Sequence, residues 1–310
     1  MSSSSARALS EWVRAVSAAI SSEDGASLAF FLRGSPPALD GGPPAASASA
    51  SSALLATFSP AHDATKSWYD CLRAHLCGGA AVRRGDAKGG FDGAHDALSA
   101  LVEAFKSSAS NWLIGALHAL VRGACAAERA LDGSLRAAGS REGAPAETSK
   151  LVRTLQSAFA AAMQHRLPRD APQSASKKCG ALAVANAVFG IYFRTNLLRQ
   201  CKHFVSSIET PGFPPMANFP RAQVVAYNYY TGVLSACEDK HGAALDRLNE
   251  ALRDCHREAA VNLRLILRML VPVSLLVAGR VPPRALLLRH GLEDMFAGLV
   301  DAFRTGDIRL

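Results

Sequence analysis

The sequence of 310 residues is poor in the features on which strands and disulfide frameworks depend. Aromatic residues make up only 7% of the chain, and runs of β-branched residues are scarce, whereas alanine is abundant. The seven cysteines form no CxxC pair and share no repeated spacing. This composition disfavours strands and a disulfide framework, and it favours closely packed helices in a protein whose thiols stay reduced in the nucleus or cytosol.

Signals for secretion and for a membrane span are also lacking. Residues 1–20 contain no basic start followed by an apolar core, so we expect no secretory signal. The most apolar stretch, Met269–Ala278, is ten residues long and contains Pro272. A membrane-spanning helix needs about 20 predominantly apolar residues. We therefore expect no membrane insertion.

The motifs that position phosphates, nucleophiles and catalytic metals are absent as well. The chain contains no GxGxxG followed by an acidic residue at the right distance, no GxxxxGK[ST], no GxSxG and no HExxH. Cys255 and His256 are adjacent, but consecutive helical residues point about 100° apart and cannot converge on one atom. Cys71 and Cys77 lack the paired spacing of zinc sites. The sequence therefore predicts a non-enzymatic protein without a metal or a cofactor.

What the chain does have is an uneven surplus of positive charge. The net charge is +8, yet residues 1–150 hold 14 basic and 14 acidic residues, which leaves 20 basic and 12 acidic residues in 151–310. A positive field of this kind attracts nucleic acid or an acidic polypeptide at rates that depend on salt. The alternative is that the arginines only solvate helix faces.

Helical periodicity, broken by Gly-, Ser- and Pro-rich stretches, predicts the domain organisation. We expect N-terminal helices in residues 1–33, a disordered Ser/Ala/Pro linker in 34–52, an N-terminal helical region in 53–175 and a helical-repeat region in 176–310. The last region reads as helix pairs about every 35–40 residues, which is typical of stacked hairpins. The predicted fold class is all-α, with a TPR-like array of stacked helical hairpins.

Some local patterns predict particular features of the packing. Gly78–Gly90 reads as a Gly-rich turn between two helices. Gly232 stands beside aromatic residues at helical spacing, so another helix can approach closely there. Residues 259–277 are apolar nearly all round, which predicts a central helix that Pro272 kinks. Gly279 is expected to cap the C-terminus of that helix.

Residues 180–310 resemble the PCI domain-containing protein 2 family. The motifs that carry the resemblance are Gly190-Ile-Tyr192-Phe193-Arg194-x-Asn196, Tyr227-x-Tyr229-Tyr230-x-Gly232, Ala251-x-x-x-Cys255-His256, Asn262-x-Arg264-x-Ile266-Leu267, Leu270-Val271-Pro272 and Gly279-x-x-Pro282. They occur in the family's order. COP9-signalosome-associated PCI proteins share these features, so the complex to which the chain belongs stays open.

The resemblance implies a helical-repeat array followed by a winged helix, which together form a PCI domain. Residues 299–308 look like the helix and turn that lead into this junction, and the sequence ends at Leu310, so we expect the winged helix to be missing. The implied role is that of a scaffold subunit of the TREX-2 messenger-RNA export complex. That role implies a nuclear location, including the nuclear pore, together with the cytoplasm.

The implied partners are the large PCI scaffold subunit of TREX-2 and a small acidic subunit of the DSS type. RNA or DNA is a further candidate ligand. Another PCI assembly, related to the COP9 signalosome or the proteasome lid, is the alternative. The basic residues expected to bind a nucleic acid or an acidic partner are Lys202, Arg221, Arg247, Arg253, Arg257 and Arg264.

Overall fold

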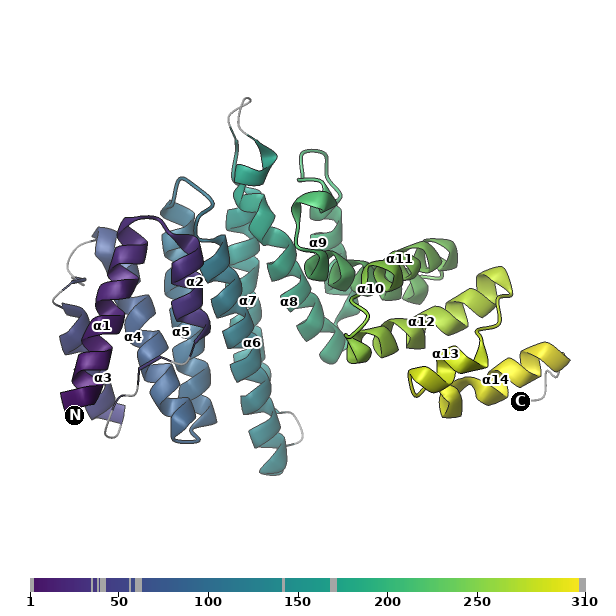
Figure 1. Ribbon diagram of the computed structural model, residues 1–310, viewed down its shortest axis with the longest axis horizontal. Coiled ribbons are helices and arrows are strands. Elements are labelled where there is room, and N and C mark those ends of the chain that lie inside the picture. The colour runs from purple at the N-terminus through teal and green to yellow at the C-terminus, as the bar shows by residue number, and fades with distance from the viewer. Residues whose placement is uncertain are drawn as a thin grey trace. The chain divides into compact units, whose positions relative to one another are not determined.

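The computed structural model describes residues 3–34, 36, 37, 39, 43–55, 57, 58, 63–140, 143–167 and 172–306. Over these residues the chain forms fourteen α-helices, four 3-10 helices and no strand (Figure 1). The all-α fold class predicted from the sequence is therefore confirmed. Residues 35, 38 and 40–42 of the predicted linker, and the chain end at Leu310, lie outside the described residues.

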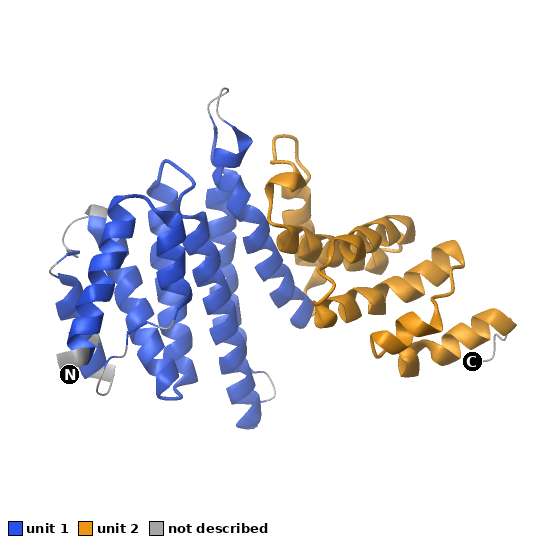
Figure 2. Cartoon of the chain, viewed as in Figure 1, with its two compact units in different colours: residues 1–195 blue, residues 196–310 orange. Residues whose placement is uncertain are grey.

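The chain divides into two compact units, residues 1–195 and 196–310 (Figure 2). The division between these compact units falls after Thr195, whereas the predicted start of the helical-repeat region at residue 176 stays a prediction. The reason for the division is the packing of α8 (Ala181–Arg194), which lies against α6 (Ile114–Ala137) and α7 (Pro145–Met163). The buried residues of α8 thus complete the core of the first unit.

The first unit is built from helices that pack on their neighbours in sequence, with α2 also packing on α6. Its remaining helices are α1 (Ser3–Ser21), α2 (Gly25–Arg33), α3 (Pro43–Leu55), α4 (Asp63–Arg83) and α5 (Ala87–Ser107). Helix α3 includes residues 43–52 of the predicted disordered linker, 34–52, so this part of the stretch is helical. Ala46, Ala50 and Leu54 are buried at a spacing of four, and α3 packs on α4. Small alanines supply this buried face, although the stretch has almost no bulky apolar residue.

The predicted Gly-rich turn at Gly78–Gly90 is likewise corrected, because α4 continues through Gly78 and Gly79 to Arg83. Gly78 faces Gly93 of α5, and a Cβ atom built on Gly93 would lie under 3.0 Å from the Gly78 backbone. The glycines therefore serve the crossing of two helices whose backbones touch. The turn itself is short and has Gly85 at a φ of 77°.

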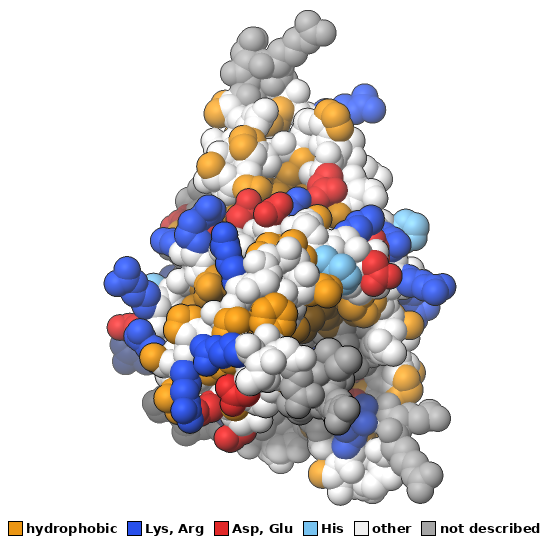
Figure 3. All heavy atoms as spheres, turned by 90° about the vertical axis from the view of Figure 1, so that its right-hand side faces the viewer, with side chains coloured by type: hydrophobic (Ala, Val, Ile, Leu, Met, Phe, Trp, Pro, Cys, Tyr) orange, Lys and Arg blue, Asp and Glu red, His pale blue; other side chains and the backbone are white. Residues whose placement is uncertain are grey.

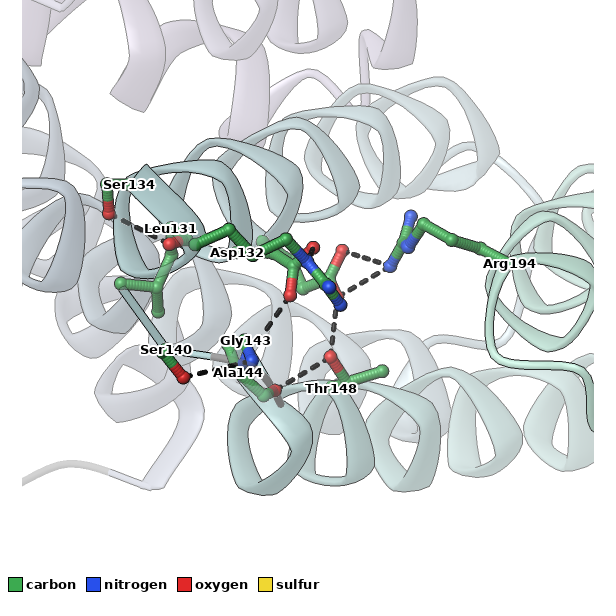
Figure 4. Close-up of polar contacts among 10 residues, drawn as sticks. Leu131, Asp132, Ser134, Ser140, Gly143, Ala144, Thr148 and Arg194 are labelled. Atoms are coloured by element: carbon green, nitrogen blue, oxygen red, sulfur yellow. Dashed lines mark hydrogen bonds and ion pairs between the residues drawn. The ribbon is translucent and has the colours of Figure 1, made fainter. Parts of the chain in front are cut away.

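A buried carboxylate ties together α6, α7 and α8 (Figure 4). The side chain of Glu128 is 1% exposed, and Arg194 donates to both of its oxygens at 2.6 and 2.5 Å. The Thr148 hydroxyl donates to the same carboxylate at 2.5 Å. A buried charge is stable only when it is paired and hydrogen-bonded. Arg194, part of the family-like motif, thus holds helix ends together.

A buried lysine closes the end of α5 in the same unit. Lys177 lies in η2 (Lys177–Gly180) and is 4% exposed, and its ammonium donates to the carbonyl of Phe105 at 2.6 Å and to that of Ser108. These carbonyls belong to the last turn of α5 and the residue that follows it, where intrahelical donors are missing. Burial lowers the pKa of Lys177. Its charge therefore serves the fold.

The second unit contains η3 (Leu198–Gln200), α9 (Cys201–Ile208), η4 (Met216–Asn218), α10 (Arg221–Cys237), α11 (His241–Asp254), α12 (Ala260–Ala278), α13 (Arg284–Arg289) and α14 (Glu293–Thr305). Helix α10 packs on α11, as the predicted hairpin required, and α11 packs on α12, while α13 packs on α14. A Cβ atom on Gly232 would lie 2.8 Å from Cγ of Leu248, so the predicted close approach at this glycine is confirmed.

Helix α12 differs from the prediction of a central helix. One face is buried and includes Ile266 and Leu270, but Val261 is 73% exposed and Leu276 is 65% exposed. Gly279 caps the helix at a φ of 58°, as expected. By length and composition alone, α12 is the one described helix that could cross a membrane, a test that a core helix of a soluble protein also passes. The helix passes this test although Arg264 and Arg268 interrupt its apolar sequence before the ten-residue stretch Met269–Ala278.

Candidate anion-binding hollow

The second unit contains a hollow of about 760 Å³ whose rim is rich in arginine. It lies where the start of α10, the end of α11, the turn before α12 and the end of α13 meet. The residues that line it are Arg221, Leu252, Arg253, Cys255, His256, Arg257, Glu258, Leu263, Arg289 and His290. Guanidinium groups that converge in this way are suited to bind carboxylate or phosphate oxygens.

The local fold places these side chains without special backbone strain. Helix α10 begins directly after Pro220, and α11 ends at Asp254 because Cys255 adopts an extended conformation. Cys255 then packs with Val225, Ala251 and Ile266 in a small hydrophobic core under the hollow. The turn that follows Cys255 is thereby fixed, and it carries His256 and Arg257 at the rim.

Two of the arginines at the rim contact a carboxylate of the chain itself, that of Asp254. Arg253 donates to Asp254 at 3.2 and 3.4 Å, and a guanidinium nitrogen of Arg221 lies 3.7 Å from the same carboxylate. The hydrogen bond from Arg253 lowers the pKa of Asp254. Within the described residues, no carboxylate lies at ion-pair distance from Arg257 or Arg289. These two exposed arginines remain open to an external anion.

The structure brings together three of the six basic residues predicted to bind an anion, namely Arg221, Arg253 and Arg257. Arg264 lies near them, because a Cβ atom on Gly291, next to His290, would be 3.9 Å from its guanidinium carbon. The other two point to partners of their own. Lys202 contacts Glu238 at 2.8 Å in a second hollow lined by residues of η3, α9 and α10.

Arg247 is the sixth predicted residue, and it joins α11 to the segment before α10. It donates to Glu209 at 3.0 Å and to the Asn228 amide oxygen at 3.4 Å. Its charge is therefore used within the unit. That these six residues bind a partner stays a prediction. Three of them line the hollow, one lies beside it and two lie elsewhere.

Sequence reasoning missed Arg289 and His290 as members of this site. Arg289 ends α13 and His290 follows it. Both are more than 30 residues away from Arg257, so no spacing rule connects them. The only local signal was the glycine stop at Gly291, whose φ is 63°. In the structure the C-terminal end of α13 lines the same hollow as the turn that precedes α12.

The thiol in the hollow is not set up as a nucleophile. Cys255 is 8% exposed, and burial raises its pKa, so the thiolate is disfavoured. Among the residues that the structure describes, no group of three or more His, Cys, Asp or Glu side chains could hold a metal ion. The hollow offers cationic hydrogen-bond donors above an apolar floor, which is a binding arrangement.

These features define the class of the protein as an all-α array with a basic hollow in its second unit. Comparison of the sequence with known proteins shows which of them it resembles. The chain is 36% identical over 155 residues to the PCI domain-containing protein 2 homolog of Dictyostelium discoideum. It is 37% identical over 134 residues to Enhanced ethylene response protein 5 of Arabidopsis thaliana and 33% identical over 163 residues to the Protein CSN12 homolog of Mycosarcoma maydis. No protein-family model matches.

The predicted resemblance to the PCI domain-containing protein 2 family, with COP9-signalosome-associated PCI proteins as relatives, is confirmed by these matches. They cover 50%, 43% and 51% of this chain and 35%, 32% and 35% of the respective relatives. The chain thus matches about a third of the length of these curated relatives. The activity and the partners of the whole protein are therefore matters for proposal.

Proposed function

We propose that the chain is a non-enzymatic scaffold subunit of a nuclear TREX-2-type complex that couples transcription to messenger-RNA export. Its partners would be the large PCI scaffold subunit and a small acidic subunit of the DSS type, and its location the nucleus, including the nuclear pore, and the cytoplasm. The observation that carries the proposal is the similarity to proteins named for a PCI domain. The helical architecture supports it, because stacked helices offer extended surfaces to partners.

Co-purification from cells of the source organism tests this assignment. A tagged full-length chain is expected to recover a large PCI subunit and a DSS-type subunit in stoichiometric amounts by mass spectrometry. Recovery of signalosome or proteasome-lid subunits instead would support the alternative assembly, which the similarity to CSN12 homologues favours. Recovery of no PCI-type or DSS-type subunit would contradict both.

A second candidate function is direct binding of RNA or DNA in the arginine-lined hollow. It is favoured by the two rim arginines, Arg257 and Arg289, that have no carboxylate beside them within the described residues. Contacts to phosphates would be independent of sequence and would weaken steeply with salt. The measurement is the dissociation constant of a single-stranded RNA at several salt concentrations. A constant that stays flat up to physiological salt would exclude this function.

A further inference from the structure

The outer face of α12 presents an apolar stripe that stays exposed among the described residues of the second unit. Val261, Leu265 and Leu276 are exposed by 73%, 42% and 65%. Together with Arg268 and Pro272 they recur at intervals of three or four residues, so they lie along one side of the helix. Exposed aliphatic stripes of this kind are typical of surfaces that another helix buries.

The apolar surface continues onto α14. Met295, Leu299 and Phe303 are spaced by four and are 45–48% exposed. The ring tip of Phe303 would lie 3.9 Å from a Cβ atom on Gly279, so α14 reaches the C-terminal end of α12. In Figure 3, which looks at the side on the right of Figure 1, hydrophobic side chains gather with Lys and Arg side chains around them.

The charges beside the stripe on α12 are mostly positive, whereas α14 also carries Glu293, Asp294 and Asp301. Residues 257–290 contain six arginines and a single acidic residue, Glu258. Arg264 and Arg268 are exposed on α12, and no carboxylate among the described residues lies at ion-pair distance from either. An occupant of this face therefore has to supply both an apolar stripe and negative charge.

We propose that the outer face of α12 docks an amphipathic helix of a partner protein whose apolar stripe is flanked by Asp and Glu. This inference rests on the proposed scaffold role. Nucleic acid fits the face less well, because phosphates leave Val261 and Leu265 uncovered and single strands bind on aromatic side chains. A second copy of the chain would set arginines against arginines, which is unfavourable.

The probes are two fluorescein-labelled synthetic helices of about 20 residues, long enough to be helical when bound. They share one leucine stripe, flanked by Glu in one peptide and by Lys in the other. Binding to the full chain is followed by fluorescence anisotropy. The acidic helix is expected to bind at least about ten-fold more tightly, because its charges complement Arg264 and Arg268.

Two sets of variants locate the site. Leu265→Asp with Leu276→Asp is expected to weaken the acidic helix by at least about ten-fold. The matched control, Phe30→Asp with Val82→Asp, removes two exposed apolar side chains from the first unit and is expected to leave binding unchanged. Arg264→Glu with Arg268→Glu is expected to reverse the preference, so that the basic helix binds more tightly.

Several results would overturn the proposal. One is equal binding of the two helices, and another is an unchanged preference in Arg264→Glu with Arg268→Glu. A third is that the α12 changes weaken the binding of a single-stranded RNA but not that of the acidic helix. Binding of anionic phosphatidylserine vesicles, or a dimer by light scattering, that the Leu265 and Leu276 changes abolish would do the same. If the acidic helix fails to bind but PCI partners still co-purify, only the proposal of a docking face is contradicted. If the acidic helix binds but no PCI partner co-purifies, only the proposed function is contradicted.

Discussion

At the scale of single residues, the Glu128–Arg194 pair is the most consequential polar contact in the first unit. Arg194→Met leaves the carboxylate of Glu128 buried with only Thr148 as a partner. Removing one partner of a buried pair costs about 3–5 kcal/mol. Because the Arg194 side chain is 33% exposed, we expect the low end, about 3 kcal/mol. Urea unfolding followed by circular dichroism measures this loss.

The control for this change is an ion pair within α6 whose arginine is exposed. Arg136 donates to Asp132 at 2.9 Å, and its side chain is 55% exposed. Exposed pairs contribute about 0–1 kcal/mol, so Arg136→Met is expected to change the free energy of unfolding little. Equal losses for Arg136→Met and Arg194→Met would show that the buried network has no special role.

His75 makes the stability of the first unit depend on pH. Its ring stacks on Trp12, its buried Nε2 has no hydrogen-bond partner among the described residues, and burial lowers its pKa from 6.5 to about 4. Below pH 6.5 the His75 ring is protonated in the unfolded chain but stays neutral in the folded protein. Stability is therefore lost as the pH falls towards 4. At pH 5 this loss amounts to about 2 kcal/mol relative to pH 7.

The measurement is urea unfolding at pH 7 and pH 5 for the natural chain and for His75→Phe, which keeps an aromatic ring against Trp12. Burial also lowers the pKa of His95 and His118, so the variant retains part of the pH dependence. The free energy of unfolding lost between pH 7 and pH 5 is expected to be about 2 kcal/mol smaller in His75→Phe than in the natural chain. His203→Gln, at an exposed position, is the matched control and should keep the full dependence.

At the scale of elements, hydrophobic periodicity predicted most helices. It could not predict the helices whose packed faces consist of alanine or glycine. Alanines in α3 and glycines in α4 carry no bulky apolar pattern, and both stretches were assigned as irregular. Their helices are fixed by partners distant in sequence, such as Gly93 for Gly78. The same limit applies to the hollow: Arg221, Arg253 and Arg257 stood out in the sequence, but only the fold shows that Arg289 lines the same hollow.

The crossing of α4 and α5 gives a prediction at this scale. Gly93→Ala forces the two helices apart, because its Cβ atom would meet the Gly78 backbone. Overpacking of this kind costs about 1–3 kcal/mol. Gly123→Ala in α6 is the matched control, since nothing lies within 4 Å of its Cβ position. We expect it to stabilise the chain by up to about 1 kcal/mol in urea unfolding, since alanine favours a helix.

At the scale of the whole molecule, the positive excess lies in two segments of net charge +5 each, and the rest of the chain has a net charge of −2, which gives +8. Residues 151–195 hold six basic residues and one acidic residue, and residues 257–290 hold six and one. In the first segment Lys177 is buried on carbonyl groups and Arg194 neutralises Glu128. In the second, a single arginine, Arg284, has an ion pair among the described residues, with Glu293 at 2.5 Å. The sequence count alone did not separate charges used internally from charges available to a partner.

Heparin, a soluble polyanion, can test this division on the full chain. Arg257→Gln with Arg289→Gln removes two charges from the hollow, and Arg153→Gln with Arg166→Gln removes two exposed charges from the first segment. Both double variants have the same net charge. We expect the first to elute from a heparin column at clearly lower salt, because converging guanidinium groups release more counterions on binding. Equal elution would mean that net charge, rather than the hollow, sets the affinity for polyanions.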